Sequence, residues 1–233
     1  MSSRFYTGDG KEYDAFVGCI PYHGDFQSLI ATTLRDRLGK ANRPRILEVG
    51  CGTGFTTEKV AAIFPEAKII ATDNDCGMLA VAIERLRGFK NVEPMEVDIF
   101  DIIDDFSPGD FDAVVSGYCA HNLTPFWRAM LFQKIGRVVK KGGAVVIGDK
   151  IARNDIVLHW NDLELGIASF EQLRGTDFAH LKGFWIQHYL NDDAIRLTES
   201  EQEVLFRMAW CDDIVLHRRW GFDAVMSGIR VNA

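Results

Sequence analysis

The sequence has little that would suit a membrane protein, a disulfide scaffold or a metal centre. It contains no apolar run of the about 18 residues that a membrane-spanning helix needs, and residues 1–6 lack the apolar stretch of a signal peptide. The five cysteines are odd in number, scattered and never spaced as C-x-x-C, so neither a disulfide framework nor a zinc site is predicted. These absences predict a cytoplasmic protein with no membrane partner.

Positive charge is also scarce. Lys and Arg number 26 against 33 Asp and Glu, which gives a net charge of −7. Because affinity for nucleic acid rests largely on basic groups that neutralise phosphates, this balance argues against a nucleic-acid partner, although a local basic patch stays open. The apolar fraction of 47% and the charged fraction of 25% are those of an ordinary globular protein.

Among the features that are present, a glycine-rich turn after an apolar strand is the most informative. The stretch I-L-E-V-G-C-G-T-G ends in Gly50, Gly52 and Gly54, which let backbone rather than side chains face a ligand. Phe55 stands where a dinucleotide fingerprint would have its third glycine. The Glu48 carboxylate would repel a pyrophosphate, but it could accept hydrogen bonds from a ligand with an ammonium group and ribose hydroxyls. A purely structural turn is the alternative.

Two acidic residues follow at the ends of predicted strands. The strand at residues 67–72 ends in Asp73, at about the 20-residue interval that places a carboxylate under the ribose hydroxyls of an adenosine. The strand at residues 92–97 is followed by Asp98, where a carboxylate or the neighbouring backbone can accept from an adenine amino group. Either acid alone could instead be a helix N-cap or a solvated strand end.

In their order, these motifs resemble the class I S-adenosylmethionine-dependent methyltransferase family. The matching segments are E-V-G-C-G-T-G, T-D-N, V-D-I, F-D-A-V-V-S and K-K-G-G-A, within residues 44–150. The resemblance implies S-adenosylmethionine as cofactor and methyl transfer to an oxygen or nitrogen of a small molecule. The predicted cofactor-binding residues are Tyr22, Glu48, Gly50, Cys51, Gly52, Gly54, Asp73, Asn74, Met78, Asp98, Ile99, Ser116, Gly117 and Tyr118.

Alternating strands and helices predict an α/β fold with a doubly wound, Rossmann-like sheet. The resemblance implies seven strands with an antiparallel last strand, formed by a hairpin at residues 213–219 and 222–231, and a helical, aromatic insertion after strand five. We expect helices at residues 55–64, 76–86, 125–139 and 199–209. We expect a single domain, divided into an N-terminal cap (1–43), a cofactor-binding core (44–148), a substrate lid (149–200) and a C-terminal helix with the hairpin (201–233).

Catalysis of methyl transfer needs no nucleophilic side chain, because the reaction is an in-line displacement that depends on placing donor and acceptor together. A base that removes a proton from the acceptor helps. His121, in the loop after the fourth strand, is the first candidate, although a buried and merely structural histidine is the alternative. Asp149 is the second, with Lys150 as a neutralising neighbour. Catechol-type members of the family hold a metal with an Asp-Asn pair near this position, so the Asp-Lys pair predicts none.

Aromatic residues crowd into the insertion at residues 149–200. Since ligands bind beyond the carboxyl ends of parallel strands, we expect this insertion to form the acceptor pocket. His188 is the third catalytic candidate, because it could supply a hydrogen bond. The predicted substrate contacts are Trp160, Trp185, His188 and Tyr189. The alternative is that these aromatics form a satellite core or the interface of a homodimer.

Carboxy-S-adenosylmethionine synthases are a branch of the family that this chain also resembles, through a Pro-x-Tyr-like entry that includes Tyr22 and a long insertion after strand five. The arginine with which those enzymes hold an extra carboxylate aligns near Val204, so plain methyl transfer is favoured. An enzyme that modifies S-adenosylmethionine or serves RNA is the alternative, and a non-catalytic binding module is a third. We also expect Tyr22 and the N-terminal segment to fold over the cofactor.

Overall fold

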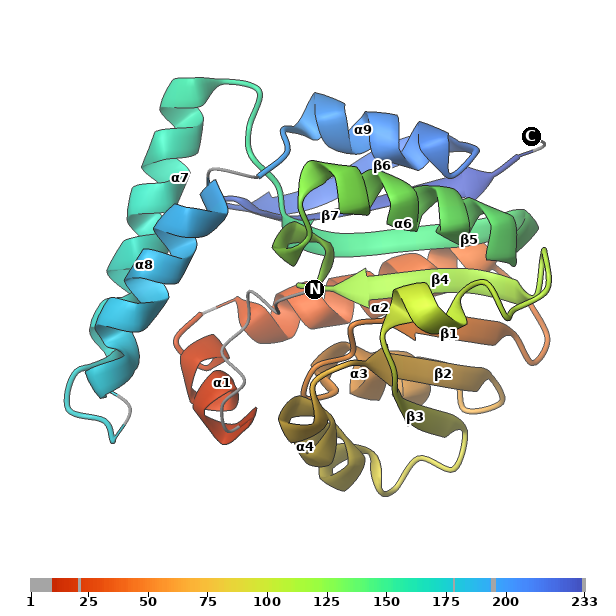
Figure 1. Cartoon of the computed structure of the whole chain (residues 1–233), viewed down its shortest axis with the longest axis horizontal. Helices are drawn as coiled ribbons and strands as arrows, with labels where there is room; N and C mark the ends of the chain where they lie inside the picture. The colour runs from red at the N-terminus through yellow and green to blue at the C-terminus, as the bar shows by residue number, and fades with distance from the viewer. Residues whose placement is uncertain (1–9, 21, 178, 194–195, 232–233) are drawn as a thin grey trace.

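The computed structural model describes residues 10–20, 22–177, 179–193 and 196–231. A twisted sheet crosses the molecule and carries helices on both faces (Figure 1). Its strand order is β3-β2-β1-β4-β5-β7-β6. The strands are β1 (Arg45–Val49), β2 (Lys68–Asp73), β3 (Val92–Glu96), β4 (Phe111–Gly117), β5 (Val139–Lys150), β6 (Cys211–Trp220) and β7 (Asp223–Arg230).

Strand directions agree with the predicted sheet. β1 to β5 pair in parallel, whereas β7 runs antiparallel to both β5 and β6. The order reverses between β1 and β4, which pair at Ile46 and Ala113. The α/β, doubly wound, seven-stranded fold with an antiparallel last strand is therefore confirmed.

Helices cover the sheet on both sides because each presents an apolar face to it. On one side α6 and α9 pack through residues such as Phe132 and Phe206; on the other, α2 and α3 pack through Phe26, Ile30 and Val60. The helices are α1 (Gly10–Val17), α2 (His23–Leu38), α3 (Phe55–Ile63), α4 (Cys76–Leu86), α5 (Ile99–Ile102), α6 (Pro125–Val138), α7 (Ile156–Ser169), α8 (Lys182–Asp193) and α9 (Glu199–Met208). Short 3-10 turns are η1 (Ala120–Asn122), η2 (Phe170–Leu173) and η3 (Ala179–Leu181).

The insertion after β5 forms two helices, α7 and α8, which lie side by side at the left of Figure 1. A cluster of aromatic residues joins them to α1 and to the turn between β6 and β7, with Phe16, Phe170, Tyr189 and Phe222 all buried. None of the helices in the described part of the chain combines the length and the apolar character that crossing a membrane requires.

Candidate functional site

The glycine turn after β1 has backbone angles that only glycine adopts without strain. Gly50, Gly52 and Gly54 have φ of 67°, 54° and 87°. Space is also restricted, since a Cβ at Gly50 would lie 2.2 Å from the sulfur of Cys119. The turn therefore needs glycine for its shape and for close packing against the end of β4.

Asp73, at the end of β2, braces this turn. One carboxylate oxygen accepts the Gly52 N–H at 2.7 Å, and the other accepts the Asp75 N–H at 3.0 Å. Burial raises the pKa of Asp73 above its ordinary value, although these N–H donors act in the opposite direction. The side chain also lines the cavity described below, so it combines a structural role with an exposed acceptor edge.

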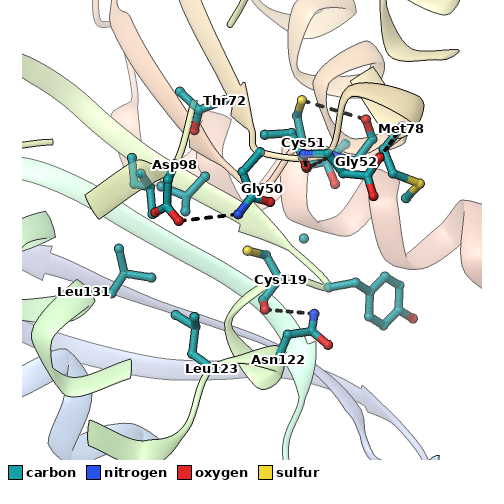
Figure 2. A pocket seen from close by; sticks show the side chains of 18 of the residues that line it. Gly50, Cys51, Gly52, Thr72, Met78, Asp98, Cys119, Asn122, Leu123 and Leu131 are labelled. Carbon is teal, nitrogen blue, oxygen red and sulfur yellow. Dashed lines mark hydrogen bonds between the residues drawn. The ribbon is translucent and has the colours of Figure 1, made fainter. Parts of the chain in front are cut away.

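Asp98 is the N-cap of α5 and accepts the Phe100 N–H at 2.9 Å. Its second oxygen is 3.4 Å from the amide nitrogen of Asn74. Figure 2 shows the carboxylate at the edge of the same cavity as Gly50 and Gly52. The N-cap interpretation of Asp98 is thus correct, and it is compatible with a place in the binding site because only one oxygen makes the cap.

A cavity of about 390 Å³ lies beyond the carboxyl ends of the parallel strands. Its size is that of a site for a nucleoside-sized ligand. Polar backbone and carboxylates form one wall, and apolar side chains such as Leu123 and Leu131 form the other (Figure 2). The predicted cofactor-binding residues that line it are Gly50, Cys51, Gly52, Asp73, Asn74, Met78, Asp98, Ile99, Gly117 and Tyr118.

His121 and Asp149 form a buried pair beside this cavity. The ring Nδ1 of His121 is 2.5 Å from one carboxylate oxygen, and its backbone N–H donates to the other oxygen at 2.8 Å. Burial acts to raise the pKa of Asp149, but the His121 partner and the Lys150 N–H outweigh it and hold that pKa below its usual range. Asp149 is therefore an anion that accepts from Nδ1–H, which makes Nε2 the acceptor nitrogen of the neutral ring.

A second, much smaller cavity of about 10 Å³ is lined by His121, Lys150, Trp185, His188 and Tyr189. Tyr13 and Tyr118 line both cavities and so form a common wall. Three of the four predicted substrate residues therefore gather with the candidate base. Asp149 lines neither cavity and acts only on His121.

Tyr118 is held in an uncommon conformation at this common wall. Its φ is 54°, in the left-handed region that a tyrosine seldom adopts, and its ring stacks on Phe26 at 4.4 Å. Strained residues that packing holds in place cluster at functional sites, so the conformation fits a residue placed for function.

Comparison with known proteins agrees with this geometry. Residues 46–143 match a family model described as a methyltransferase domain. The chain belongs to the class I S-adenosylmethionine-dependent methyltransferase family. The matched residues run from β1 into β5 and include the glycine turn, Asp73, Asp98 and His121.

Two curated relatives carry different activities in their names. A malonyl-[acyl-carrier protein] O-methyltransferase from Paenibacillus sp. is 32% identical over 139 residues, covering 56% of this chain and 49% of the relative. A carboxy-S-adenosyl-L-methionine synthase from Helicobacter pylori is 28% identical over 157 residues, covering 65% and 63%. The chain thus spans about half of the first relative and under two thirds of the second.

The structure is also similar to that of human N-acetylserotonin methyltransferase in complex with SAM. The TM-score is 0.60 at 14% identity, over 91% of this chain and 53% of that one. At this identity the likeness shows the fold alone, and it agrees with the strand order of this methyltransferase.

Glu48 corrects one expectation about the cofactor site. Its side chain is completely buried and does not line the cavity. Burial raises its pKa to about 8, so the group is mostly a neutral acid near pH 7 rather than the anion expected to meet the ligand. Its place in the middle of the sheet, paired with Ala71 and Val115, explains the difference.

Three more predicted cofactor residues of this methyltransferase lie outside the cavity. Tyr22 donates its hydroxyl hydrogen to Asp223 at 2.9 Å and stacks on Trp220 instead. Ser116 donates to a backbone oxygen of β1, and Gly54 packs against α4. Each of them supports a residue that does line the cavity.

Trp160 is the predicted substrate residue that the structure places elsewhere. It lies on the outer side of α7 with half of its surface exposed, and neither cavity includes it. Trp185 and Tyr189 also belong to the aromatic core around Phe16, whose ring stacks on Trp185 at 3.8 Å. For these two, the satellite-core interpretation and the acceptor-pocket prediction hold together.

Several cavity residues were not anticipated. Tyr13 and Gln27 come from α1 and α2, while Trp127 and Leu131 come from α6. These are ordinary apolar or polar positions of helices, so no motif marks them. Only the folded arrangement, which brings three helix ends to one strand edge, makes them neighbours of the glycine turn.

Proposed function

We propose that this protein transfers the methyl group of S-adenosylmethionine to an oxygen or nitrogen of a small molecule. One observation carries the proposal: the cavity with the glycine turn and Asp73 shares the wall of Tyr13 and Tyr118 with the cavity that His121 lines. A cofactor site and a base on opposite sides of one wall are what methyl transfer from a bound sulfonium needs.

The cavity residues fit the parts of the cofactor in order. Asp73 would accept from the ribose hydroxyls, and Asp98 with the apolar side chains Ile99 and Phe100 would hold the adenine. The methionine end would then lie along Gly50 toward the common wall. When bound, the cofactor supplies a methyl group on a positively charged sulfur.

His121 would act on the acceptor. Its Nε2 takes the proton from the acceptor's O–H or N–H as the new bond to the methyl carbon forms, and the electron pair of the broken carbon–sulfur bond stays on sulfur. Asp149, which holds Nδ1–H at 2.5 Å, stabilises the resulting imidazolium. His188, the other candidate from the insertion, lines the same cavity and would orient the acceptor.

Two alternatives rest on the relatives. An enzyme that modifies S-adenosylmethionine, or serves RNA, is supported by the carboxy-S-adenosyl-L-methionine synthases among them. Against it, Val204, which aligns with the carboxylate-binding arginine, lies on α9 with 55% of its surface exposed and lines neither cavity. Methyl transfer therefore remains the better-supported proposal.

The proposal includes a cytoplasmic location and a small-molecule partner. All five cysteines are free thiols, which suits a reducing compartment. The enclosed acceptor cavity and the net charge of −7 favour a small molecule over nucleic acid.

Mass spectrometry of small molecules that co-purify with the chain tests the proposal. We expect S-adenosylmethionine or S-adenosylhomocysteine, and release of S-adenosylhomocysteine when a panel of phenols, carboxylic acids and amines is supplied. Recovery of a carboxylated cofactor would instead support the alternative, and recovery of an unrelated nucleotide would overturn both.

A further inference from the structure

Exposed apolar side chains concentrate on α7 and α8. Of the eleven large apolar residues that are exposed in the described part of the chain, seven lie on these two helices. They are Ile156, Val157, Leu158, Trp160, Leu165, Phe184 and Leu190. Single exposed apolar residues are normal on a protein surface, but a concentration of this kind marks a contact surface. We call these seven residues the hairpin surface.

The spacing on α7 places its members toward one side. Val157 and Trp160 are three residues apart, and Leu158 and Leu165 are seven apart, which are spacings that bring side chains together along a helix. The other side of α7 is covered, because Leu163 is buried in the aromatic core and Asp162 is paired with Arg153 at 2.5 Å. α7 therefore has one side committed to the protein body and one apolar side that faces outward.

Charge is nearly absent from the hairpin surface. Among the exposed side chains that the structure describes on α7 and α8, Glu164 is the charged one. A strongly acidic or basic macromolecule would find no counter-charge here, whereas the depletion of charge is typical of the centre of a protein–protein interface. Two copies of this chain could meet at such a surface despite their net charge of −7 each, because that charge lies elsewhere.

The area is also sufficient. The exposed parts of the seven side chains sum to roughly 700 Å² per copy, against the about 800 Å² that each partner contributes to a standard interface. We propose that the hairpin surface is the interface of a homodimer in which α7 and α8 of two copies pack together about a twofold axis. This assigns Trp160 to the interface rather than to the substrate pocket.

The dimer would brace the active site from behind. The inner side of α8 carries Trp185, His188 and Tyr189 to the second cavity, so the same helix would present one side to the partner and the other to the acceptor. The inference stands on exposure and charge alone, and it does not depend on the proposed reaction.

Sedimentation velocity of the full chain over a range of concentrations tests the proposal. We expect a species of twice the chain's mass at micromolar concentrations, and a monomer for Leu165→Glu and for Val157→Glu. Val204→Glu is the matched control: it places the same charge on an exposed apolar residue of α9, outside the hairpin surface, and should stay dimeric. Far-UV circular dichroism checks that each variant is folded.

Three results would overturn the proposal. The unaltered chain could be a monomer throughout the range, including one that binds phospholipid vesicles instead. The two hairpin variants could remain dimeric while folded, which would move the interface elsewhere. Val204→Glu could dissociate as readily as Leu165→Glu, which would show a general effect of charge.

Discussion

Asp73 is the residue on which cofactor binding depends most directly, because its carboxylate combines the brace of Gly52 with a place in the cavity wall. Loss of hydrogen bonds to a charged acceptor costs about 1.5–3 kcal/mol, so Asp73→Ala should weaken S-adenosylmethionine binding by one to two orders of magnitude. Calorimetric titration measures this, with Asp36→Ala, an exposed acid of α2, as control. Unchanged affinity in Asp73→Ala would remove the ribose assignment.

The pair of Asp149 and His121 makes a second prediction. Asp149→Asn keeps the shape of the side chain but removes the anion that holds Nδ1–H, so we expect turnover to fall about 100-fold or more while cofactor affinity changes little. Release of S-adenosylhomocysteine with the accepted substrate is the readout, and calorimetry provides the second measurement. Full turnover in the variant would mean that proximity alone drives the reaction.

Glu48 predicts a dependence of stability on pH. Its folded pKa of about 8 lies above the ordinary value, so the buried group contributes stability that is fully present below the unfolded pKa and is lost as pH rises through about 8. Glu48→Gln has no such proton to lose. At pH 9 the variant should therefore be more stable relative to the unaltered chain than at pH 4, by roughly 2–4 kcal/mol, since each unit of pKa shift is worth about 1.4 kcal/mol.

Urea unfolding at pH 4 and pH 9 measures this difference. Asp223, whose buried carboxyl has a pKa raised to about 6, is present in both proteins and cancels in the comparison. A difference in stability that does not change between the two pH values would show that Glu48 is charged in the folded protein.

At the scale of elements, α1 sits on the glycine turn through one arginine. Arg85 of α4 donates to the Thr53 carbonyl of the turn at 2.8 Å and to Asp14 of α1 at 2.6 Å, and it lies over the ring of Phe55. Cofactor binding that orders the turn should therefore slow hydrogen exchange in α1.

Arg85→Gln should abolish most of that protection, because it breaks the connection between turn and helix. The control is Arg87→Gln, which removes an arginine two residues away whose partner is the exposed Glu84. Hydrogen exchange with mass spectrometry reads residues 10–17 in each protein. Equal protection in both variants would show that α1 does not respond through Arg85.

Element boundaries were predictable where a side chain caps a helix. The predicted helix at residues 76–86 matches α4, whose N-cap Asp75 accepts two backbone N–H groups. α2 begins at His23, three residues before the predicted start, because its N-cap Tyr22 makes no side-chain cap and leaves no signal. β5 begins at Val139 instead of residue 144, since a glycine irregularity at Gly142 lets it pair with β4 earlier.

The candidate site was predictable to the same extent. Short motifs with a physical reason, such as the glycines and Asp73, identified the polar wall of the cavity. The opposite wall, with Trp127 and Leu131, and the contribution of Tyr13 from α1 depend on tertiary packing, which a single sequence does not reveal. Glu48 shows the converse, since its position in the motif was clear but its burial was not.

At the scale of the whole molecule, the strand order explains where the site lies. The sheet reverses direction of assembly between β1 and β4, and ligands of open parallel sheets bind at that point, beyond the carboxyl ends of the strands. The later helices α7 and α8, together with α1, then enclose the acceptor side. In this conformation the acceptor cavity is too small for a substrate, so entry requires α1 or α8 to move.

Calorimetric titration of the unaltered chain with S-adenosylmethionine, and separately with ATP, tests the central claim most directly. The two ligands share adenosine but differ in the group that must pass the glycine turn. We predict saturable binding of one S-adenosylmethionine per chain at micromolar concentrations, and ATP binding at least 100-fold weaker. No heat with S-adenosylmethionine, or equal affinity for ATP, would contradict the assignment of this cavity to a methyl-donor cofactor.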